Sequence, residues 1–144
     1  MSSENSEIVS RAREWLGTPY RHQSATKGSG CDCLGLIVGI WRELFGDHKF
    51  ELPPYSRNWR DQSHAAQLRA LADRHLMLLE KADLKSGQVV LLRMHTGLPA
   101  KHCAIVTEPN RFIHAQERVG VVEVPISNWW RRRIVAQFEF PERT

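Results

Sequence analysis

The segment Asp32-Cys33-Leu34-Gly35-Leu36-Ile37 marks the point at which a polar loop gives way to an apolar helix. Asp32 is a preferred N-cap residue, so it places Cys33 at the first helical position. Gly46 supplies a stop signal, and the spacing therefore predicts a helix over residues 33–45. Its buried stripe is expected to comprise Cys33, Leu36, Ile37, Ile40, Trp41 and Leu44.

Two glycines, Gly35 and Gly39, lie four residues apart within this helix. Each glycine costs a helix about 1 kcal/mol relative to alanine. We therefore expect this helix to be strongly buried, with another part of the chain packed closely against its glycine face.

In the rest of the chain, helices precede strands. Apolar residues follow helical spacing over about residues 6–16, residues 20–30 are expected to form a loop, and a third helix is predicted from Leu68 to Leu79, with His75 at the edge of the core. Strands are predicted over residues 88–93, 102–107, 111–116, 119–124 and 133–140. This order predicts an α+β domain, with helices packed against one face of a mostly antiparallel sheet of about five strands.

The composition is that of one globular domain. With 42% apolar and 25% charged residues, we expect a single domain over residues 1–144, with disorder limited to a few residues at each end. The formal charge is +4, but no repeated basic-aromatic pattern accompanies it, so no nucleic-acid partner is expected. The run Arg131 to Arg133 beside Trp129 and Trp130 is expected to be a solvated turn next to buried aromatic rings.

Two further features indicate where the chain is made. No apolar run approaches the roughly 18 residues of a membrane span, and the start lacks the pattern of a signal peptide. We therefore expect synthesis in the cytoplasm and no membrane span. Three cysteines cannot all pair, and Cys31 and Cys33 are too close for a comfortable disulfide, so free thiols are expected.

The chemistry centres on Cys33. A thiol at a helix start is stabilised as thiolate by the helix dipole and by backbone N–H groups. Asp32 opposes ionisation through its negative charge, so a reactive Cys33 requires a nearby imidazolium. This requirement singles out His102 and His114, which lie in two successive predicted strands.

Strand geometry predicts that these two imidazoles meet. Alternation turns the His102 side chain away from that of Cys103, which is expected to be a core residue. A three-residue loop with Asn110 in the left-handed region would pair Thr107 with Arg111. Gln116 would then lie opposite His102, and His114 would lie diagonal to His102 on the same face.

This arrangement supplies a nucleophile, a base and an orienting group. We expect His102 to take the proton of Cys33 and His114 to fix the tautomer of His102, with Gln116 as the fallback orienting group. The oxyanion would be bound by the backbone N–H of Cys33, aided by the Tyr20 hydroxyl. Tyr20 is equally compatible with a packing role.

Four motifs, in the order in which they occur along the chain, resemble those of the NlpC/P60 peptidases, papain-like enzymes that cut peptidoglycan stem peptides. The resemblance spans about residues 8 to 140. The motifs are Gly17-Thr18-Pro19-Tyr20, Asp32-Cys33-Leu34-Gly35, Lys101-His102-Cys103-Ala104-Ile105-Val106 and Phe112-Ile113-His114-Ala115.

The resemblance implies a papain-like fold and a role for each matching residue. Cys33 would be the nucleophile, His102 the base and His114 the third polar residue, with Tyr20 and Asp32 on the oxyanion or substrate side. The implied reaction is hydrolysis of the amide between D-glutamate and a diamino acid, without a cofactor or metal. Leu34 stands where the family commonly has serine, so the substrate groove is expected to differ.

A loop feature indicates a branch of the family. The long loop with His22, Gln23 and Lys27, together with the extra Cys31, most resembles peptidases of phage tails and gene-transfer agents. That branch implies a peptidoglycan peptide as substrate and tail proteins as partners. Its members would act in the periplasm or at the cell wall.

Three alternatives remain open at this point. In the first, Cys33 is merely the first buried residue of an apolar helix, because free cysteines are often inert core residues. Thiolates and imidazoles also bind zinc, which would use Cys31, Cys33, His102 and His114. Finally, the chain could be a catalytically silent tail or wall-binding module, because fold alone does not establish activity.

Overall fold

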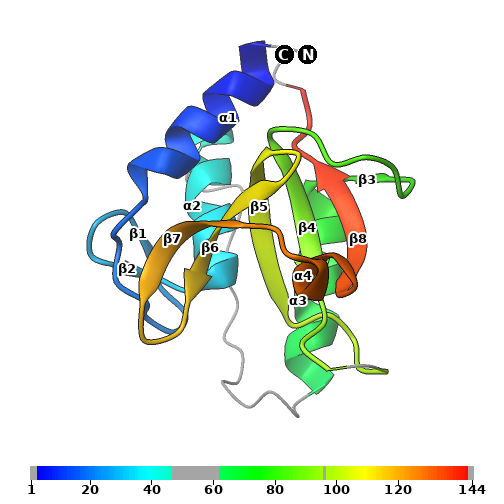
Figure 1. Cartoon of the computed structure of the whole chain (residues 1–144). Helices are drawn as coiled ribbons and strands as arrows, with labels where there is room; N and C mark the ends of the chain where they lie inside the picture. Colours follow the sequence, from blue (N-terminus) through cyan, green and yellow to red (C-terminus); the bar gives the residue numbers. More distant parts are fainter. Residues whose placement is uncertain (1–2, 47–61, 96, 143–144) are drawn as a thin grey trace.

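The computed structural model describes residues 3–46, 62–95 and 97–142 (Figure 1). The helices and strands among these residues are α1 (Ser3–Glu14), β1 (Ala25–Thr26), β2 (Gly30–Cys31), α2 (Cys33–Phe45), α3 (Gln62–His75), β3 (Met77–Leu79), β4 (Gln88–Leu92), β5 (His102–Glu108), β6 (Arg111–Gln116), β7 (Gly120–Pro125), α4 (Asn128–Arg131) and β8 (Ile134–Glu139).

Six strands form one sheet in the order β3-β8-β4-β5-β6-β7, and every neighbouring pair is antiparallel. The short strands β1 and β2 form a separate hairpin before α2. The predicted α+β fold with a mostly antiparallel sheet is therefore confirmed, with six strands rather than about five.

The additional strand is β3, in residues that apolar spacing assigns to the third helix. That helix, α3, ends at His75, and Leu79 pairs instead with Gln137 of β8. Three residues are too few to show an alternating pattern, so their apolar character was compatible with a continued helix. His75 lies at the edge of the core as expected, with its ring 5.2 Å from that of Trp41.

The first helix also differs from its predicted bounds of residues 6–16. It ends at Glu14, and the Leu16 amide then bonds to the Arg13 carbonyl in a tight turn. This turn leaves Leu16 42% exposed, outside the core to which its spacing assigns it. In contrast, α2 has the predicted bounds, and Gly46 closes it through a hydrogen bond from its amide to the Arg42 carbonyl.

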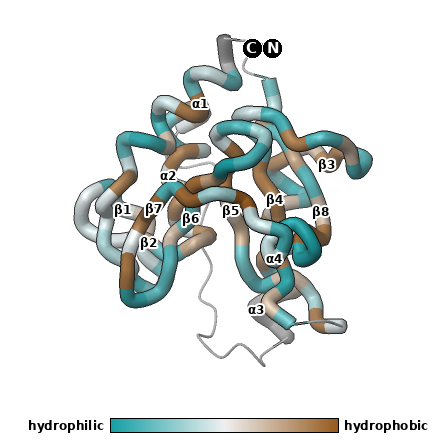
Figure 2. Tube along the Cα trace, viewed as in Figure 1, coloured by the Kyte–Doolittle hydropathy of each residue, from teal (hydrophilic) through white to brown (hydrophobic). Residues whose placement is uncertain are grey.

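The sheet is buried on both faces. Apolar residues run along the central strands in Figure 2, and β4 is buried over its whole length. One face, which carries Val89, Leu91 and Ile105, packs against α1, α2 and α3. The other carries Val90, Ala104, Val106 and Phe112, and packs against Ile126 and the half-buried Trp130 of α4.

The two glycines of α2 allow the close approach that their spacing predicts. A Cβ atom on Gly35 would lie 1.8 Å from the Ser24 carbonyl oxygen, so the loop before α2 rests directly on this helix. A Cβ atom on Gly39 would lie 2.2 Å from the Trp15 ring. Trp15 itself is 1% exposed and has no room to withdraw.

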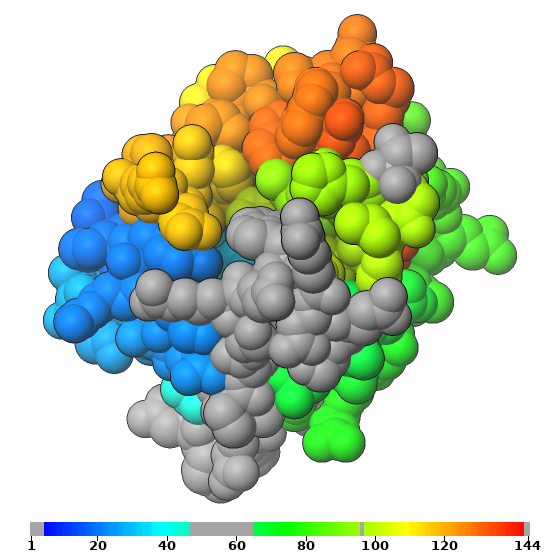
Figure 3. All heavy atoms as spheres, turned by 90° about the horizontal axis from the view of Figure 1, so that it is seen from below, coloured from blue at the N-terminus to red at the C-terminus, as the bar shows by residue number. Residues whose placement is uncertain are grey.

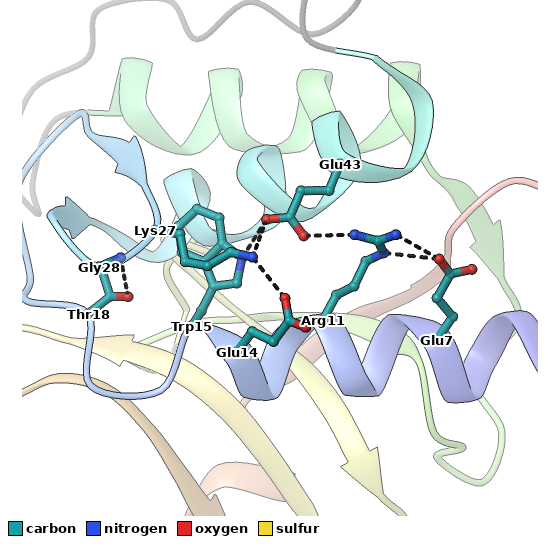
Figure 4. Close-up of polar contacts among 8 residues, drawn as sticks. All are labelled: Glu7, Arg11, Glu14, Trp15, Thr18, Lys27, Gly28 and Glu43. Atoms are coloured by element: carbon teal, nitrogen blue, oxygen red, sulfur yellow. Dashed lines mark hydrogen bonds and ion pairs between the residues drawn. The ribbon is translucent and has the colours of Figure 1, made fainter.

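Polar contacts fasten α1, α2 and the β1–β2 hairpin together (Figure 4). Glu43 of α2 accepts a hydrogen bond from the Trp15 indole at 3.2 Å and pairs with Arg11 and Lys27. Lys27 also bonds to Glu14 at 2.8 Å. Ion pairs this exposed are individually weak. Because Arg11 and Lys27 both pair with Glu43, however, these contacts connect α1, α2 and the hairpin through one side chain.

The chain between α1 and the hairpin lies along the edge of β7. The Gly17 amide donates to the Val121 carbonyl, and the Val121 amide donates to the Thr18 carbonyl, at 3.0 and 2.9 Å. Gly120 has a φ of 107°, and a Cβ atom there would lie 2.7 Å from the Thr18 oxygen. Figure 3 shows blue atoms of the N-terminal part of the chain beside the golden-yellow β6–β7 region.

Adding a methyl group at Gly39 should destabilise the fold. The Gly39→Ala variant must displace the Trp15 ring, at a cost of about 1–3 kcal/mol of unfolding free energy that exceeds the gain in helix propensity. Urea denaturation measures this loss. Ser10→Ala, on the exposed side of α1, is the control and should change stability by less than about 0.5 kcal/mol. Equal stability of the two variants would contradict the close packing.

Candidate active site

Asp32 joins the start of α2 to the preceding loop. Its Oδ1 accepts a hydrogen bond from the Gly35 amide at 2.7 Å, which is the predicted N-cap, and its Oδ2 accepts one from the Gln23 amide at 2.8 Å. Gln23 has a φ of 60°, an unusual value for this residue type. Because Asp32 is only 2% exposed, these bonds give it a structural role at the site.

Cys33 occupies the first position of α2, as predicted, and is 6% exposed. The Cys103 thiol donates a hydrogen bond to the Cys33 carbonyl at 3.2 Å. The helix start therefore lies directly over the beginning of β5. Cys103 belongs to the helix-side core, as alternation predicts.

All three cysteines carry free thiols, as expected from their spacing. Burial raises the pKa of Cys31 to about 12, and the neighbouring Asp32 and Cys33 contribute in the same direction. The pKa of Cys103 is also raised, first by a hydrogen bond with the Cys33 side chain and then by burial. Cys31 and Cys103 are therefore held as protonated thiols at neutral pH.

The structure brings His102 and His114 together. His102 Nε2 lies 2.8 Å from His114 Nδ1, and the two rings are nearly perpendicular at 76°. Both are buried, at 7% and 3% exposure. Because His102 uses Nε2 for this bond, Nδ1 is the ring atom left to face another group.

The strand register behind this contact is partly as predicted. Ile105 pairs with Ile113, the alignment that places His114 diagonal to His102. The turn differs, because Arg111 pairs with Glu108 and an irregularity in β5 takes up Thr107. Asn110 is also not among the described residues with positive φ, so the expected left-handed loop is wrong.

Burial controls the charge state of His114. It lowers the pKa of this imidazole to about 3, and the nearby His102 adds to the shift. His114 is therefore neutral at physiological pH, with one ring nitrogen protonated. A neutral imidazole can orient His102 through a hydrogen bond without adding a second positive charge.

Tyr20 lies beside the residues that lead into α2. It forms a parallel bridge with Cys31, supported by the hydrogen bond from the Cys31 amide to the Pro19 carbonyl. Its half-buried side chain packs against the helix-side core. Gln116 is exposed and pairs with Gly120 at the β6–β7 turn, while His114 provides the polar contact to His102.

Leu34 lies in the core rather than at the surface. It is 4% exposed and lines a small apolar cavity between α2, α3 and the sheet, together with Ile37, Leu71 and Cys103. A serine at this position would leave part of that space unfilled. Leu34, which stands where the resembled family commonly has serine, therefore fills space between α2 and α3.

The zinc alternative requires four side chains in one place. Within residues 3–46, 62–95 and 97–142, no group of three or more histidine, cysteine or acidic side chains is arranged to hold a metal ion. The same residues contain no helix that is both long and apolar enough to cross a membrane.

The aromatic surroundings of the two histidines were not predicted from the sequence. Trp130 stacks on His102 with ring centroids 5.9 Å apart, and it meets His114 edge to face at 5.4 Å. Phe112 lies 5.1 Å from His114. The available signal was Ser127, an N-cap residue whose side chain accepts a hydrogen bond from the Trp130 amide at the start of the short helix α4.

Loss of the Asp32 carboxylate should loosen the helix start. The Asp32→Ala variant leaves the Gly35 and Gln23 amides without this acceptor, which should cost about 1–3 kcal/mol of unfolding free energy. Chemical denaturation measures the loss, and hydrogen exchange at the two amides locates it. Ser127→Ala removes an exposed cap and is the milder control. Unchanged protection at both amides would contradict the role of Asp32.

Stability should fall in acid through His114. The unfolded chain binds a proton at this side chain below about pH 6.5, whereas the folded chain binds it only near pH 3. The unfolding free energy should therefore decrease between these values, by at most about 1.4 kcal/mol per pH unit. Denaturation at several pH values measures this slope, which should become shallower in His114→Gln. An identical slope in both proteins would refute the assignment.

Two curated proteins are similar to this chain in sequence. A probable endopeptidase of Haemophilus influenzae is 26% identical over 126 residues, which cover 87% of this chain and 68% of that protein. The murein DD-endopeptidase MepH of Escherichia coli is 22% identical over 129 residues. That match covers 88% of this chain but only 42% of the relative.

Solved structures share the fold. The NlpC/p60 domain of the peptidoglycan hydrolase SagA has a TM-score of 0.64 at 19% identity, covering 96% of this chain and 98% of that one. NlpC2 from Trichomonas vaginalis has a TM-score of 0.69 at 16% identity, covering 97% of this chain and 47% of that one. A model of the NlpC/P60 family matches residues 17–138, from the loop before Tyr20 into β8. The chain therefore belongs to the NlpC/P60 family.

Proposed function

We propose that this chain is a cysteine peptidase that hydrolyses an amide bond in the stem peptides of peptidoglycan. The observation that carries the proposal is the 2.8 Å contact between His102 Nε2 and His114 Nδ1. His102 is the first residue of β5, and the next residue, Cys103, donates a hydrogen bond to the Cys33 carbonyl. The relatives named as endopeptidases support the same reaction class.

The proposed pairing of Cys33 with His102 uses the remaining ring nitrogen. With Nε2 bonded to His114, Nδ1 of His102 takes the thiol proton and leaves a thiolate beside an imidazolium. The Cys103–Cys33 contact supports this pairing because adjacent Cα atoms are about 3.8 Å apart, which keeps the His102 backbone near the helix start. The start of α2 also favours the thiolate through its dipole.

The reaction then proceeds in two stages. The Cys33 sulfur attacks the amide carbon, and the positive end of α2, the Cys33 backbone N–H and the Tyr20 hydroxyl stabilise the oxyanion. The C–N bond breaks as His102 gives its proton to the leaving amine, which leaves a thioester. Water, deprotonated by His102, attacks the thioester carbon and releases the carboxylic acid and the thiol.

The scissile bond is the finer part of the proposal. The resemblance favours the amide between D-glutamate and the diamino acid, whereas one relative is named a DD-endopeptidase. Mass spectrometry of muropeptides after digestion separates these cuts by the masses of the released fragments. A cut only at a bond between two D-centres would contradict the first assignment.

Variants of the proposed machinery should lose activity without unfolding. Cys33→Ala and His102→Ala should each reduce peptidoglycan cleavage by about 10⁴-fold or more, because the two groups act as a unit. His114→Ala should cost less than either, because it removes only the partner that orients His102. Digestion of purified peptidoglycan measures these losses, and circular dichroism confirms folding. Cys31→Ala is the matched control and should retain most of the activity.

Thiol reactivity distinguishes an enzyme from a catalytically silent module. Iodoacetamide should modify Cys33 faster than Cys31 or Cys103, whose pKa values are raised. The rate at Cys33 should fall in His102→Ala. A Cys33 that reacts slowly in both proteins, together with intact peptidoglycan, would favour the silent module.

We propose further that the chain acts at the cell wall as part of a phage tail or gene-transfer agent. The long loop before α2 supports this placement through resemblance, although Lys27 and Cys31 of that loop have structural contacts here. Mass spectrometry of purified particles tests the proposal, because the chain should copurify with tail proteins. Its absence from such particles would contradict it.

A further inference from the structure

We propose that Lys101 binds a carboxylate on the residue whose amine leaves when the amide bond is cut. Arg93 and Arg133 add positive charge beside it, and the three residues form a cationic row at the end of the sheet where His102 lies. This inference rests on the proposed function, because it concerns how that site selects its substrate.

The residues of the cationic row flank three adjacent strands. Arg133 comes directly before β8, Arg93 directly after β4 and Lys101 directly before β5. Because β8, β4 and β5 are antiparallel neighbours, these positions lie at the same end of the sheet. The Arg93 amide donates to the Arg133 carbonyl at 2.9 Å, and the Lys101 amide donates to the Leu92 carbonyl at 3.0 Å. Neighbouring strands are about 4.8 Å apart, so the three backbones lie within roughly 10 Å of one another. In Figure 3, yellow-green atoms of the β4–β5 region lie beside orange atoms of the α4–β8 region.

Lys101 is buried, although lysine is among the residues that proteins most rarely bury. It is 6% exposed, and within residues 3–46, 62–95 and 97–142 its amine has no hydrogen bond or ion pair. A lysine covers its stem and keeps its amine toward water, and a charge in such confined surroundings is unfavourable without an acceptor. An anion that arrives from solvent would supply this acceptor.

The two arginines of the cationic row also lack an acidic partner within the part of the chain that the structure describes. The Arg93 guanidinium donates to the Arg132 carbonyl at 3.0 Å, and the Arg133 guanidinium donates to the Trp129 carbonyl at 2.8 Å. The Nε atoms of Arg93 and Arg133 are buried without a hydrogen-bond partner. Neutral carbonyl groups do not cancel the guanidinium charges, so the like charges of the row repel one another. The row therefore favours an anion over a neutral or cationic group.

The position of Lys101 relative to His102 indicates which part of the substrate it binds. The two residues are consecutive, so their Cα atoms are about 3.8 Å apart. In the proposed reaction His102 gives its proton to the leaving amine, so the residue that bears this amine lies beside His102. That residue is an amino acid with a carboxyl group, and the expected diamino acid can carry a second one in its side chain. An ammonium group binds a carboxylate through a charge-assisted hydrogen bond.

The first test measures binding without turnover. Titration calorimetry of Cys33→Ala uses a D-glutamyl peptide of a diamino acid that has two carboxyl groups. Two further peptides carry an amide at either the terminal or the side-chain carboxyl group. Amidation of the carboxylate that Lys101 binds should weaken binding by about 10- to 100-fold, the range for losing a hydrogen bond to a charged group. Equal affinity for all three peptides would overturn the inference.

The second test connects this carboxylate with Lys101. When Lys101→Met is added to Cys33→Ala, the free peptide should bind about 10- to 100-fold more weakly, whereas binding of the sensitive amidated peptide should not change. Lys101→Arg keeps the charge and should retain the preference for the free peptide. The peptide whose amidation penalty disappears in Lys101→Met identifies the carboxylate. Penalties that persist unchanged in that variant would contradict the assignment to Lys101.

Kinetics separate substrate binding from a structural role. With Cys33 in place, Lys101→Met should raise KM for the free peptide and leave kcat nearly unchanged, because the contact is made before and during the reaction. Cleavage of the sensitive amidated peptide should not change, whereas slower cleavage of both peptides would show a structural effect on His102 and overturn the inference. Lys85→Met is the control, because it removes the same charge from an exposed residue near the opposite end of β4, and it should match the wild type.

The binding data keep this inference separate from the proposed function. If the wild type cleaves neither the peptides nor peptidoglycan, the proposed function is wrong. The calorimetric comparison of free and amidated peptides still decides whether Lys101 binds a carboxylate, because it does not depend on turnover.

Discussion

The two hydrogen bonds accepted by the Asp32 carboxylate are the constraint on which the rest of this structure depends. One starts α2 at Cys33, and the other fastens the preceding loop through Gln23. Gly35 then lets the Ser24 carbonyl rest on the helix. A single buried side chain thus sets both the helical position of the thiol and the path of the loop that carries Tyr20. The negative charge that this requires is also what an imidazolium must outweigh if the thiol is to ionise.

Local signals predicted the parts of the fold that depend on neighbouring residues. The bounds of α2 followed from Asp32 and Gly46. The interior register of β5 and β6 is the one predicted, although the three-residue loop from which it was predicted is wrong. The strand β3 was missed because it pairs with β8, about 60 residues further along the chain, and three apolar residues give no sign of so distant a partner. The turn at Asn110 was wrong because an irregularity in the strand replaced the expected loop conformation.

The proposed site likewise combines contacts between nearby residues, which could be predicted, with contacts between distant segments, which could not. The meeting of His102 and His114 was predictable, because both lie in one hairpin and side chains on a strand alternate. The contacts of Trp130 were not, because α4 reaches the histidines only after the chain has passed through β7. The fold thus approaches the proposed site from both faces of the sheet, with the thiol supplied by a helix on one side and aromatic cover supplied by α4 on the other.

The segment formed by Gly17 and Thr18, which hydrogen-bonds to β7, also protects the protein against aggregation through this edge strand. Outer strands expose backbone groups that can recruit a foreign strand, and Gly17 and Thr18 occupy those groups at Val121. The same hydrogen bonds direct the chain toward Tyr20. A mutation that displaces this segment would therefore disturb the proposed site and also expose the edge of β7. Such a mutation would favour aggregation, whereas a mutation at His102 leaves the edge of β7 covered.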